Sequence, residues 1–344
     1  MFININEKSS KPKYKQVVDA IISKISDGSL KIGEKIPSIN KLSEDTYLSR
    51  DTVEKAYKYL KEKKIIVSVK GKGYYTAKTD LISKVNILFL INKLSSYKMR
   101  LYNSFVNNMG LNAHVNLFIY HYDESLFTNL INKHIGGYDY YVIMSHFTDD
   151  KMKYIDSNES IINTIKKIPA NKLILLDNQL SQITGNYINV YQDFKLDIYD
   201  ALNEGIKKLS KYKKLILVYP TNSIYPYPKD IVLGFKKFCV EHFFNFEVID
   251  EIYKDMEFET PECFLIINEM DLVFLVKQTR EKKLILGKDI GVISYNDTPL
   301  KDLLGITVMC TDFKQMGKSI AEMILKNEKR KFKNNFTYID RNSL

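Results

Sequence analysis

Beyond residue 84 the sequence alternates between two kinds of segment, and this alternation limits the possible folds more than any other feature. Short apolar runs of strand length are separated by longer segments in which apolar side chains recur with helical spacing. The strand-like runs are 85–91, 115–120, 138–144, 172–177, 187–191, 214–219, 246–252, 263–268 and 291–295. The helical segments include 98–109, 193–210, 231–244 and 312–325. Repeated strand–helix–strand units predict parallel sheets with helices on both faces.

The number of these units is too large for one doubly wound sheet. It predicts an α/β region built from two lobes, each with its own doubly wound parallel sheet. In sheets of this type, ligands bind beyond the carboxyl ends of the strands. Two facing lobes therefore predict a binding cleft between them.

The first 76 residues follow a different pattern, with three short helices and a hairpin. A helical stripe over 14–27 ends at Gly28, and two further helices begin where Ser38 and Ser49 can cap them. Two strand-like runs within 65–76 are joined by a Lys-Gly-Lys-Gly turn. This order predicts an α+β winged helix-turn-helix over 1–76, joined by a polar linker at 77–84 to the larger region.

Positive charge is concentrated in the N-terminal region. The chain of 344 residues has a formal net charge of +10, and residues 1–80 hold 17 Lys and Arg against 10 Asp and Glu. This excess suits a polyanionic partner such as nucleic acid. The alternative is that the whole protein is simply rich in lysine.

Several classes of protein are disfavoured. Cys239, Cys263 and Cys310 lie far apart, without the spacing of a zinc site or a disulfide framework. The chain contains no apolar run long enough for a membrane helix, and its first residues lack the apolar core of a signal peptide. We therefore expect a cytoplasmic protein with no membrane partner, no metal and no cofactor.

The N-terminal region carries a dense motif. It reads Pro-Ser-x-x-x-Leu at 37–42, Ser-Arg-x-Thr-Val-x-x-Ala-x-x-x-Leu at 49–60 and Gly-x-Gly at 71–73. Over 14–76 this pattern resembles the GntR family of winged-helix regulators. The resemblance implies DNA contacts from the start of the third helix and from the tip of the hairpin. The sequence departs from the family pattern at Asn40 and Glu54, where many members of the family carry arginine.

The residue types agree with this resemblance. The first turn of a recognition helix meets base edges, and Arg50 can bind guanine O6 and N7 with two hydrogen bonds. The hydroxyls of Ser38 and Thr52 and the backbone amides of both helix starts can bind phosphates. The candidate DNA-binding residues are Ser38, Ser49, Arg50, Asp51, Thr52, Lys70, Gly71 and Lys72.

The larger region carries a second, looser motif. Residues 289–298 read Asp-Ile-Gly-Val-Ile-Ser-Tyr-Asn-Asp-Thr, followed by Ile-Thr-Val at 306–308 and Met-Gly at 316–317. Over most of 85–330 the chain resembles the effector-binding core of LacI/GalR-type regulators, which are related to periplasmic sugar-binding proteins. The resemblance implies a homodimer and ligand contacts from Asp177, Asn268 and Asn296. A GntR-type head on such a core is similar to fucose- and arabinose-responsive repressors.

Polar residues after strands can bind the hydroxyls of a sugar, because they pair hydrogen-bond donors with acceptors. The family usually has an arginine in the helix that holds Ile231 and an aspartate at the position of Asn296, and this chain has neither. Alternatively, such residues only cap helices or form turns, and the tyrosines only pack the lobes. Further candidates for ligand binding are Ser95, Ser145, His146, Tyr191 and Lys229.

Together these features predict a dimeric repressor whose affinity for operator DNA is controlled by a monosaccharide. We expect 85–344 to bind the effector and to form the dimer. The sequence contains no GxSxG, GxGxxG, P-loop or HExxH motif, so we expect no enzyme activity. The alternatives are a soluble sugar-binding protein, a GntR-type head fused to a pyridoxal-phosphate enzyme, and an architectural DNA-binding protein without a ligand.

Overall fold

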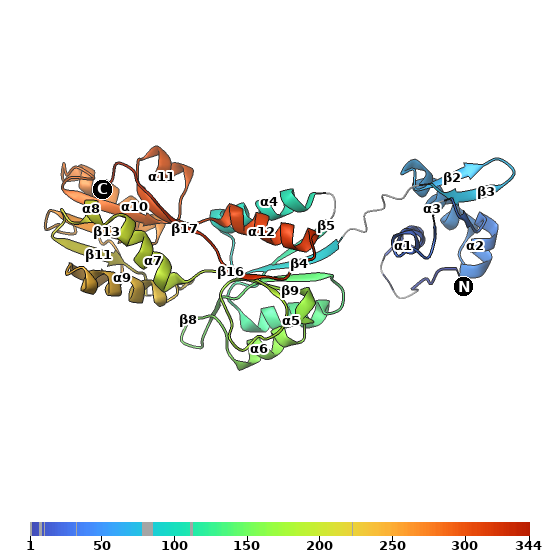
Figure 1. The fold of residues 1–344 in the computed structure, drawn as a ribbon, viewed down its shortest axis with the longest axis horizontal. Coiled ribbons are helices and arrows are strands. Elements are labelled where there is room, and N and C mark those ends of the chain that lie inside the picture. Colours follow the sequence, from blue (N-terminus) through green and yellow to red (C-terminus); the bar gives the residue numbers. More distant parts are fainter. Residues whose placement is uncertain are drawn as a thin grey trace. The chain divides into compact units, whose positions relative to one another are not determined.

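The structure is a computed structural model that forms two compact units, Met1–Lys84 and Val85–Leu344 (Figure 1). Apart from Ala77, the expected linker at 77–84 lies outside the described residues. No helix in the described part of the chain is long and apolar enough to cross a membrane. The described residues are 2–6, 9, 11–31, 33–77, 85–110, 113–221 and 223–344.

The first unit is a three-helix domain with a small antiparallel sheet in the order β1-β3-β2, which confirms the predicted winged helix-turn-helix fold. The wing is the hairpin of β2 and β3. Strand β1, which pairs Lys35 with Tyr75, was not expected from the sequence. The elements are α1 (Lys13–Ser26), β1 (Lys35–Ile36), α2 (Ile39–Thr46), α3 (Arg50–Glu62), β2 (Ile66–Val69) and β3 (Gly73–Thr76).

Local interactions explain where α2 and α3 begin. The side chain of Ser38 accepts a hydrogen bond from the Lys41 amide, and that of Ser49 accepts one from the Thr52 amide. Each serine thus satisfies a backbone donor that the helix leaves free at its first turn. The buried stripe of α3 then packs on α1 and α2 in one core, formed by Val17, Val18, Ile21, Leu42, Val53, Ala56, Tyr57 and Leu60 among others.

The second unit contains two lobes. Lobe A, made of residues 85–191 and 313–333, has a parallel sheet in the order β16-β10-β9-β6-β4-β5 and a separate two-stranded ribbon, β7-β8. Its elements are β4 (Val85–Ile91), α4 (Ser96–Met109), β5 (Ala113–Ile119), α5 (Glu124–His134), β6 (Tyr140–Met144), β7 (Phe147–Thr148), β8 (Tyr154–Ile155), α6 (Glu159–Lys166), a short 3-10 turn (Ala170–Lys172), β9 (Leu173–Asp177), β10 (Ile188–Tyr191), α12 (Phe313–Leu325) and β16 (Lys331–Lys333).

Both faces of the lobe A sheet are covered, as its continuous apolar strands require. On β4, Phe89 belongs to the core formed with α4 and α12, whereas Leu88 and Leu90 belong to the core formed with α5 and α6. Neighbouring side chains on a strand point to opposite faces, so a single strand supplies both cores.

Lobe B, made of residues 194–311 and 336–344, has a sheet in the order β12-β11-β13-β14-β15-β17. Helices α7 and α9 pack on one face of this sheet, and α10 packs on the other. Its elements are α7 (Phe194–Glu204), α8 (Ile206–Leu209), β11 (Lys214–Val218), α9 (Asp230–Glu241), β12 (Asn245–Ile249), β13 (Glu262–Ile266), α10 (Glu269–Glu281), β14 (Ile290–Tyr295), α11 (Pro299–Leu303), β15 (Thr307–Thr311) and β17 (Phe336–Ile339).

The chain passes between the lobes three times, after β10, after β15 and after β16 (Figure 1). Hydrogen bonds join these connections. The Asn334 amide donates to the Tyr191 carbonyl at 2.7 Å, and the Asp312 amide donates to the Asn335 carbonyl at 3.0 Å. The three connections therefore form one bundle where the carboxyl ends of both sheets meet.

The larger unit differs from the sequence-based expectation in several details, because β7, β8, β15, β16 and β17 were not among the predicted strands. The segment 193–210 is not one helix, because the chain divides into α7 and α8 at Gly205. The lobe B sheet is also not entirely parallel, because β17 runs antiparallel to β15. Strand β17 enters from the last crossover, at the edge where the parallel strands end, so it can only run back along the sheet.

Candidate functional site

The first turn of α3 presents polar side chains on the surface of the first unit. Ser49, Arg50 and Asp51 are exposed, and the Ser49 hydroxyl lies 2.8 Å from the Thr52 hydroxyl. Ser38 is exposed at the start of α2. Since the caps use serine oxygens as acceptors, the hydroxyl hydrogens of Ser38 and Ser49 can still donate to a phosphate.

The wing places its basic residues at the tip of the β2–β3 hairpin. Lys70, Gly71 and Lys72 are all exposed, and the Lys72 amide closes the turn by donating to the Val69 carbonyl at 2.9 Å. Gly71 has a φ of +75°, a left-handed conformation that glycine adopts without strain. The turn thus holds two ammonium groups away from the body of the domain.

Tyr47, between α2 and α3, has a φ of +55° and is 92% exposed. A left-handed conformation destabilises the folded state by about 1–2 kcal/mol at a non-glycine residue, and glycine removes this penalty. Glycine also gives the unfolded chain more conformational freedom, which offsets part of that gain. We therefore expect Tyr47→Gly to stabilise the domain by about 0.5–1 kcal/mol. Hydrogen exchange of the α3 amides in the full chain measures this gain.

Tyr59→Gly provides the matched control for Tyr47→Gly, because Tyr59 is also exposed but lies within α3. Glycine inside a helix lowers stability by about 0.5–1 kcal/mol relative to alanine, so this variant should exchange faster. Faster exchange in Tyr47→Gly as well would show that the Tyr47 side chain stabilises the turn.

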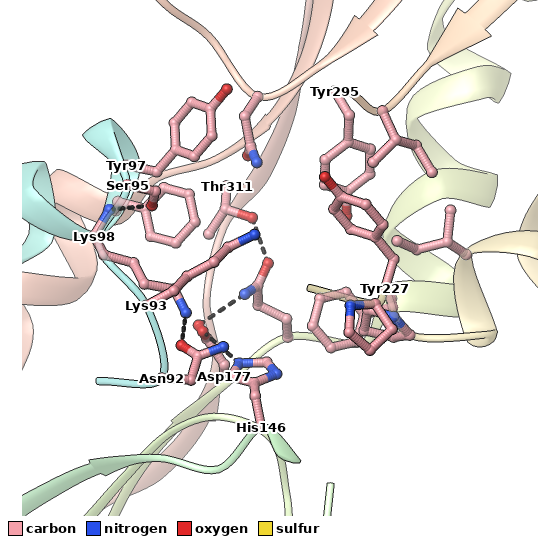
Figure 2. Close-up of a pocket in the computed structure, with 18 of the residues that line it drawn as sticks. Asn92, Lys93, Ser95, Tyr97, Lys98, His146, Asp177, Tyr227, Tyr295 and Thr311 are labelled. Carbon is pink, nitrogen blue, oxygen red and sulfur yellow. Dashed lines mark hydrogen bonds and ion pairs between the residues drawn. The ribbon is translucent and has the colours of Figure 1, made fainter. Parts of the chain in front are cut away.

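The second unit contains a cavity of about 130 Å³ between lobes A and B. Lobe A contributes residues that follow β4, β6 and β9, together with the first turn of α4. Lobe B contributes the loop before α9 and the end of β14. Figure 2 shows its polar side, where Asn92, Lys93, Lys98, His146 and Asp177 approach one another.

Asp177 accepts two side-chain hydrogen bonds in the cavity (Figure 2). His146 Nε2 donates to its Oδ2 at 2.9 Å, and Gln192 Nε2 donates to its Oδ1 at 2.8 Å. Its φ of +68° turns the side chain out of the end of β9. Burial opposes ionisation, but the bond from His146 and the nearby Lys98 ammonium hold the pKa of Asp177 below its usual value. Asp177 is thus a buried carboxylate, and each oxygen keeps a lone pair for a ligand.

The position of His146 is set by a chain of hydrogen bonds. Asn178 Nδ2 donates to the Tyr154 hydroxyl at 2.8 Å, and that hydroxyl lies 2.9 Å from His146 Nδ1. This network assigns the proton of the imidazole to Nε2, which faces Asp177. Burial lowers the pKa of His146, so the ring is neutral at pH 7. The ribbon β7-β8 therefore contributes to the site indirectly, because its Tyr154 fixes the orientation of His146.

Four of the eight candidate ligand residues line the cavity, namely Ser95, His146, Asp177 and Asn296. The other four do not belong to its lining. The Ser145 hydroxyl donates to the Asp156 carbonyl, and Asn268 Oδ1 caps α10 by accepting from the Met270 amide. Lys229 is exposed at the start of α9, and Tyr191 lies half-buried at the end of β10.

Sequence reasoning missed several residues of the lining, including Asn92, Lys93, Lys98, Gln192 and Tyr227. Asn92, Lys93 and Gln192 directly follow strands, so the rule that identified Asp177 could also have found them. Nothing in the sequence distinguishes Lys98 from an ordinary exposed lysine on a helix.

The two units resemble different known proteins. Residues 13–75 match the family model described as bacterial regulatory proteins, gntR family. The HTH-type transcriptional repressor YtrA of Bacillus subtilis (strain 168) is 36% identical over 83 residues, 23% of this chain and 64% of YtrA. The mannosyl-D-glycerate transport/metabolism system repressor MngR of Escherichia coli (strain K12) is 38% identical over 65 residues, 19% of this chain and 27% of MngR. The chain thus spans less than two thirds of either relative.

Solved structures resemble the larger part of the chain. The trehalose repressor from Escherichia coli has a TM-score of 0.59 at 12% identity, over 75% of this chain and 100% of that one. A LacI family regulator from Enterococcus faecalis V583 with bound ribose has a TM-score of 0.55 at 18% identity, over 75% and 98%. A dimeric Lac repressor has a TM-score of 0.58 at 13% identity, over 75% and 98%. Residues 13–75 therefore form a GntR-type helix-turn-helix domain, and the larger unit has the periplasmic-binding-protein-like fold of LacI-type regulators.

Proposed function

We propose that this chain is a dimeric, sequence-specific transcription repressor that acts on DNA in the cytoplasm and is controlled by a small ligand. The observation that carries the proposal is the exposed first turn of α3 within a domain that matches the gntR family. The two relatives named above, YtrA and MngR, are both described as repressors. Because the relatives are regulators, we propose no enzyme activity.

For DNA reading, α3 is the recognition helix. Arg50 would contact a guanine in the major groove, with Ser49, Asp51 and Thr52 beside it. Lys70 and Lys72 of the wing would reach a neighbouring groove or phosphate, since both are exposed at the tip of the turn. Gly71 lets the backbone of the turn approach the DNA, and Ser38 would bind a phosphate at the start of α2.

For effector binding, the site is the cavity between the lobes, and the ligand is a monosaccharide or a derivative of one. Asp177, Asn296, His146 and Ser95 would bind its hydroxyl groups. The fold likeness to a LacI family regulator that contains ribose supports this ligand class. Asn296 Oδ1 is buried and has no hydrogen-bond partner among the described residues, which leaves it free to accept from a hydroxyl.

For assembly, an exposed apolar surface on lobe B suits a second copy of the chain. Glu269 at the start of α10 lies 3.8 Å from Lys301 of α11, so the two helices begin side by side. A twofold dimer uses the same surface on both copies and matches a pseudo-palindromic operator. The exposed apolar side chains of α10, of α11 and of the residue that follows α11 are Met270, Val273, Phe274, Leu300, Leu303 and Leu304.

Contacts between the lobes provide the means of control. The Tyr97 hydroxyl of lobe A donates to Glu269 of lobe B at 2.8 Å, and the rings of Tyr122 and Tyr225 lie 5.5 Å apart. A ligand that binds both lobes stabilises this arrangement over one in which these contacts are open. It shifts DNA affinity only by its differential affinity for the two arrangements. Release from DNA by the ligand is the expected sign.

Fluorescence anisotropy of the full chain on DNA from upstream of its own gene tests the proposal, with and without a panel of monosaccharides. We expect sequence-specific binding that needs two half-sites, together with one sugar or sugar derivative that shifts the binding curve. Equal affinity for scrambled DNA would refute the role of α3 in reading sequence. Binding to one half-site as tight as to two would refute the dimer.

Asp177→Asn is expected to weaken binding of the hydroxyl groups of the effector by about 10- to 150-fold, which is the contribution of one charge-assisted hydrogen bond. Asparagine keeps the shape of the side chain and tolerates the left-handed backbone, but it has no charge. Calorimetric titration measures the change in affinity for the effector. DNA affinity without effector should stay the same, because the DNA-reading residues lie in the other unit.

Asp255→Asn is the matched control for Asp177→Asn. Asp255 also has a left-handed backbone, with a φ of +60°, but it is exposed on lobe B. This variant should bind effector as the original chain does. An undiminished effector affinity in Asp177→Asn would remove Asp177 from the binding site.

A further inference from the structure

Two lysine side chains enter the cavity, and neither has an acidic partner in contact. Lys98 projects from the first turn of α4 and is only 8% exposed, and its ammonium donates to Asn92 Oδ1. Lys93 follows β4, and its ammonium lies 4.8 Å from the centre of the Tyr225 ring and 5.5 Å from that of Tyr227. Among the described residues, no carboxylate lies within 4 Å of either ammonium. Figure 2 shows both side chains extending toward the same space.

The single carboxylate in the described lining of the cavity does not neutralise the positive charge of both lysines. Asp177 is the one carboxylate among the described residues that line the cavity, and its oxygens are already bound by His146 and Gln192. His146 contributes no negative charge. With both ammonium groups protonated, the lining therefore carries one positive charge more than it carries negative charges.

The first turn of α4 adds to this positive potential. Ser95 caps the helix, and Ser95, Tyr97 and Lys98 all line the cavity, so the N-terminus of a helix of 14 residues opens onto it. The aligned peptide dipoles of a helix favour negative charge at that end. The helix terminus and the two lysines thus act on the same part of the cavity.

Burial of Lys98 is unfavourable in the empty protein. Desolvation lowers the pKa of Lys98 to about 7, and Asp177 offsets this only in part. Desolvation also lowers the pKa of Lys93. A buried ammonium without a contacting anion is destabilising, and an anionic group bound beside it would remove most of the penalty.

We propose that the effector carries an anionic group, a carboxylate or a phosphate, that binds between Lys93, Lys98 and the first turn of α4. This inference rests on the proposed function, because it names the chemical class of the ligand in the same cavity. On the other side, Asn296 Oδ1 and the Tyr295 hydroxyl are buried without hydrogen-bond partners among the described residues. Together with Asp177 they bind the hydroxyl groups of the same molecule. The ligand is therefore a sugar acid or a sugar phosphate.

Calorimetry of the full chain with ribose, ribonate and ribose 5-phosphate, at constant ionic strength, compares a neutral sugar with its two anionic forms. We expect one anionic form to bind at least about tenfold more tightly than ribose, which corresponds to one charge-assisted contact. Lys98→Met should remove that advantage. Ribose binding as tightly as both anions would overturn the inference while leaving the proposed function intact.

Inorganic phosphate and acetate test the proposed anion-binding part of the cavity alone, because they carry the anionic group without the sugar. Compared with chloride at equal ionic strength, one of them should raise the thermal midpoint of the original chain. A response to phosphate alone identifies a phosphate group, and a response to acetate alone identifies a carboxylate. The increase should be absent in Lys98→Met and present in Lys236→Met, a control that removes an exposed lysine of α9. Equal responses in both variants, or none in the original chain, would overturn the inference.

The pH dependence of anion binding provides a readout that a merely structural role of Lys98 would not change. The charged and titratable groups facing Lys98 are Lys93, Asp177, His146 and Tyr122. A bound anion raises the pKa of Lys98, so affinity for a carboxylate ligand should fall as pH rises through about 7, the pKa of Lys98 in the free protein. In Lys98→Met this fall should be largely lost. An identical pH profile in the variant would contradict the role of Lys98.

Discussion

Gly317→Val is expected to lower the free energy of unfolding of the larger unit by about 3 kcal/mol. Gly317 lies on α12 where this helix crosses α4. A Cβ atom at this position would lie 2.4 Å from the Leu101 carbonyl oxygen and 2.9 Å from the Phe105 nitrogen. Both are backbone atoms of α4, so no side chain can move aside, and the helices must separate. The Ser104 hydroxyl, which donates to the Lys314 carbonyl at 2.7 Å, would lose this bond.

The loss should extend to the cavity, because α4 carries Ser95 and Lys98 in its first turn. Urea unfolding followed by circular dichroism measures stability, and effector titration measures the cavity. Lys318→Val introduces the same side chain one residue further along α12, at an exposed position. It should lower stability by about 0.5 kcal/mol, the difference in helix propensity. Equal losses of unfolding free energy in Gly317→Val and Lys318→Val would show that α4 and α12 can move apart without destabilising the unit.

Arg50→Ala is expected to lower affinity for the operator by about 1–3 kcal/mol, or roughly 5- to 150-fold. The arginine is exposed in the first turn of α3, where a recognition helix reads bases. Two hydrogen bonds from a guanidinium to guanine have no substitute in alanine, whereas contacts to phosphates remain. Affinity for scrambled DNA should therefore change little, and specificity should fall. Anisotropy titrations with both DNAs measure the two effects.

Lys61→Ala is the control on the same helix. Lys61 is exposed in the last turn of α3, away from the first turn, which holds Arg50. Its removal should change operator affinity by less than about 0.5 kcal/mol. Operator affinity that is unchanged in Arg50→Ala would show that another residue of the domain reads the sequence.

The sequence predicted the DNA-reading domain well because its determinants are local. A serine cap acts within three residues, as the hydrogen bond from the Lys41 amide to the Ser38 side chain shows, and the buried stripe of α3 repeats every turn. The wing follows from glycines at the turn between two short strands. Strand β1 was missed because only pairing with a distant strand makes Lys35 and Ile36 a strand.

In the larger unit, the sequence predicted the two sheets and the place of Asp177. Apolar strands followed by polar residues are a local pattern, and parallel sheets present such residues at one edge. The same rule also selected Asn268 and Ser145, whose side chains bond with the Met270 amide and the Asp156 carbonyl. A strand end thus identifies candidates, but local hydrogen bonds decide which of them remain available to a ligand.

By itself, then, the sequence determined most of the longer elements, the two kinds of unit and the residues at strand ends, because these depend on interactions within a few residues. Only the tertiary structure decided that β17 runs antiparallel and that Lys98 is buried beside Asp177. Both outcomes depend on segments far apart in the chain. The last crossover delivers β17 to the cavity edge of its sheet, and packing of α4 against α12 holds Lys98 at the cavity. The net charge of the cavity lining follows from that packing.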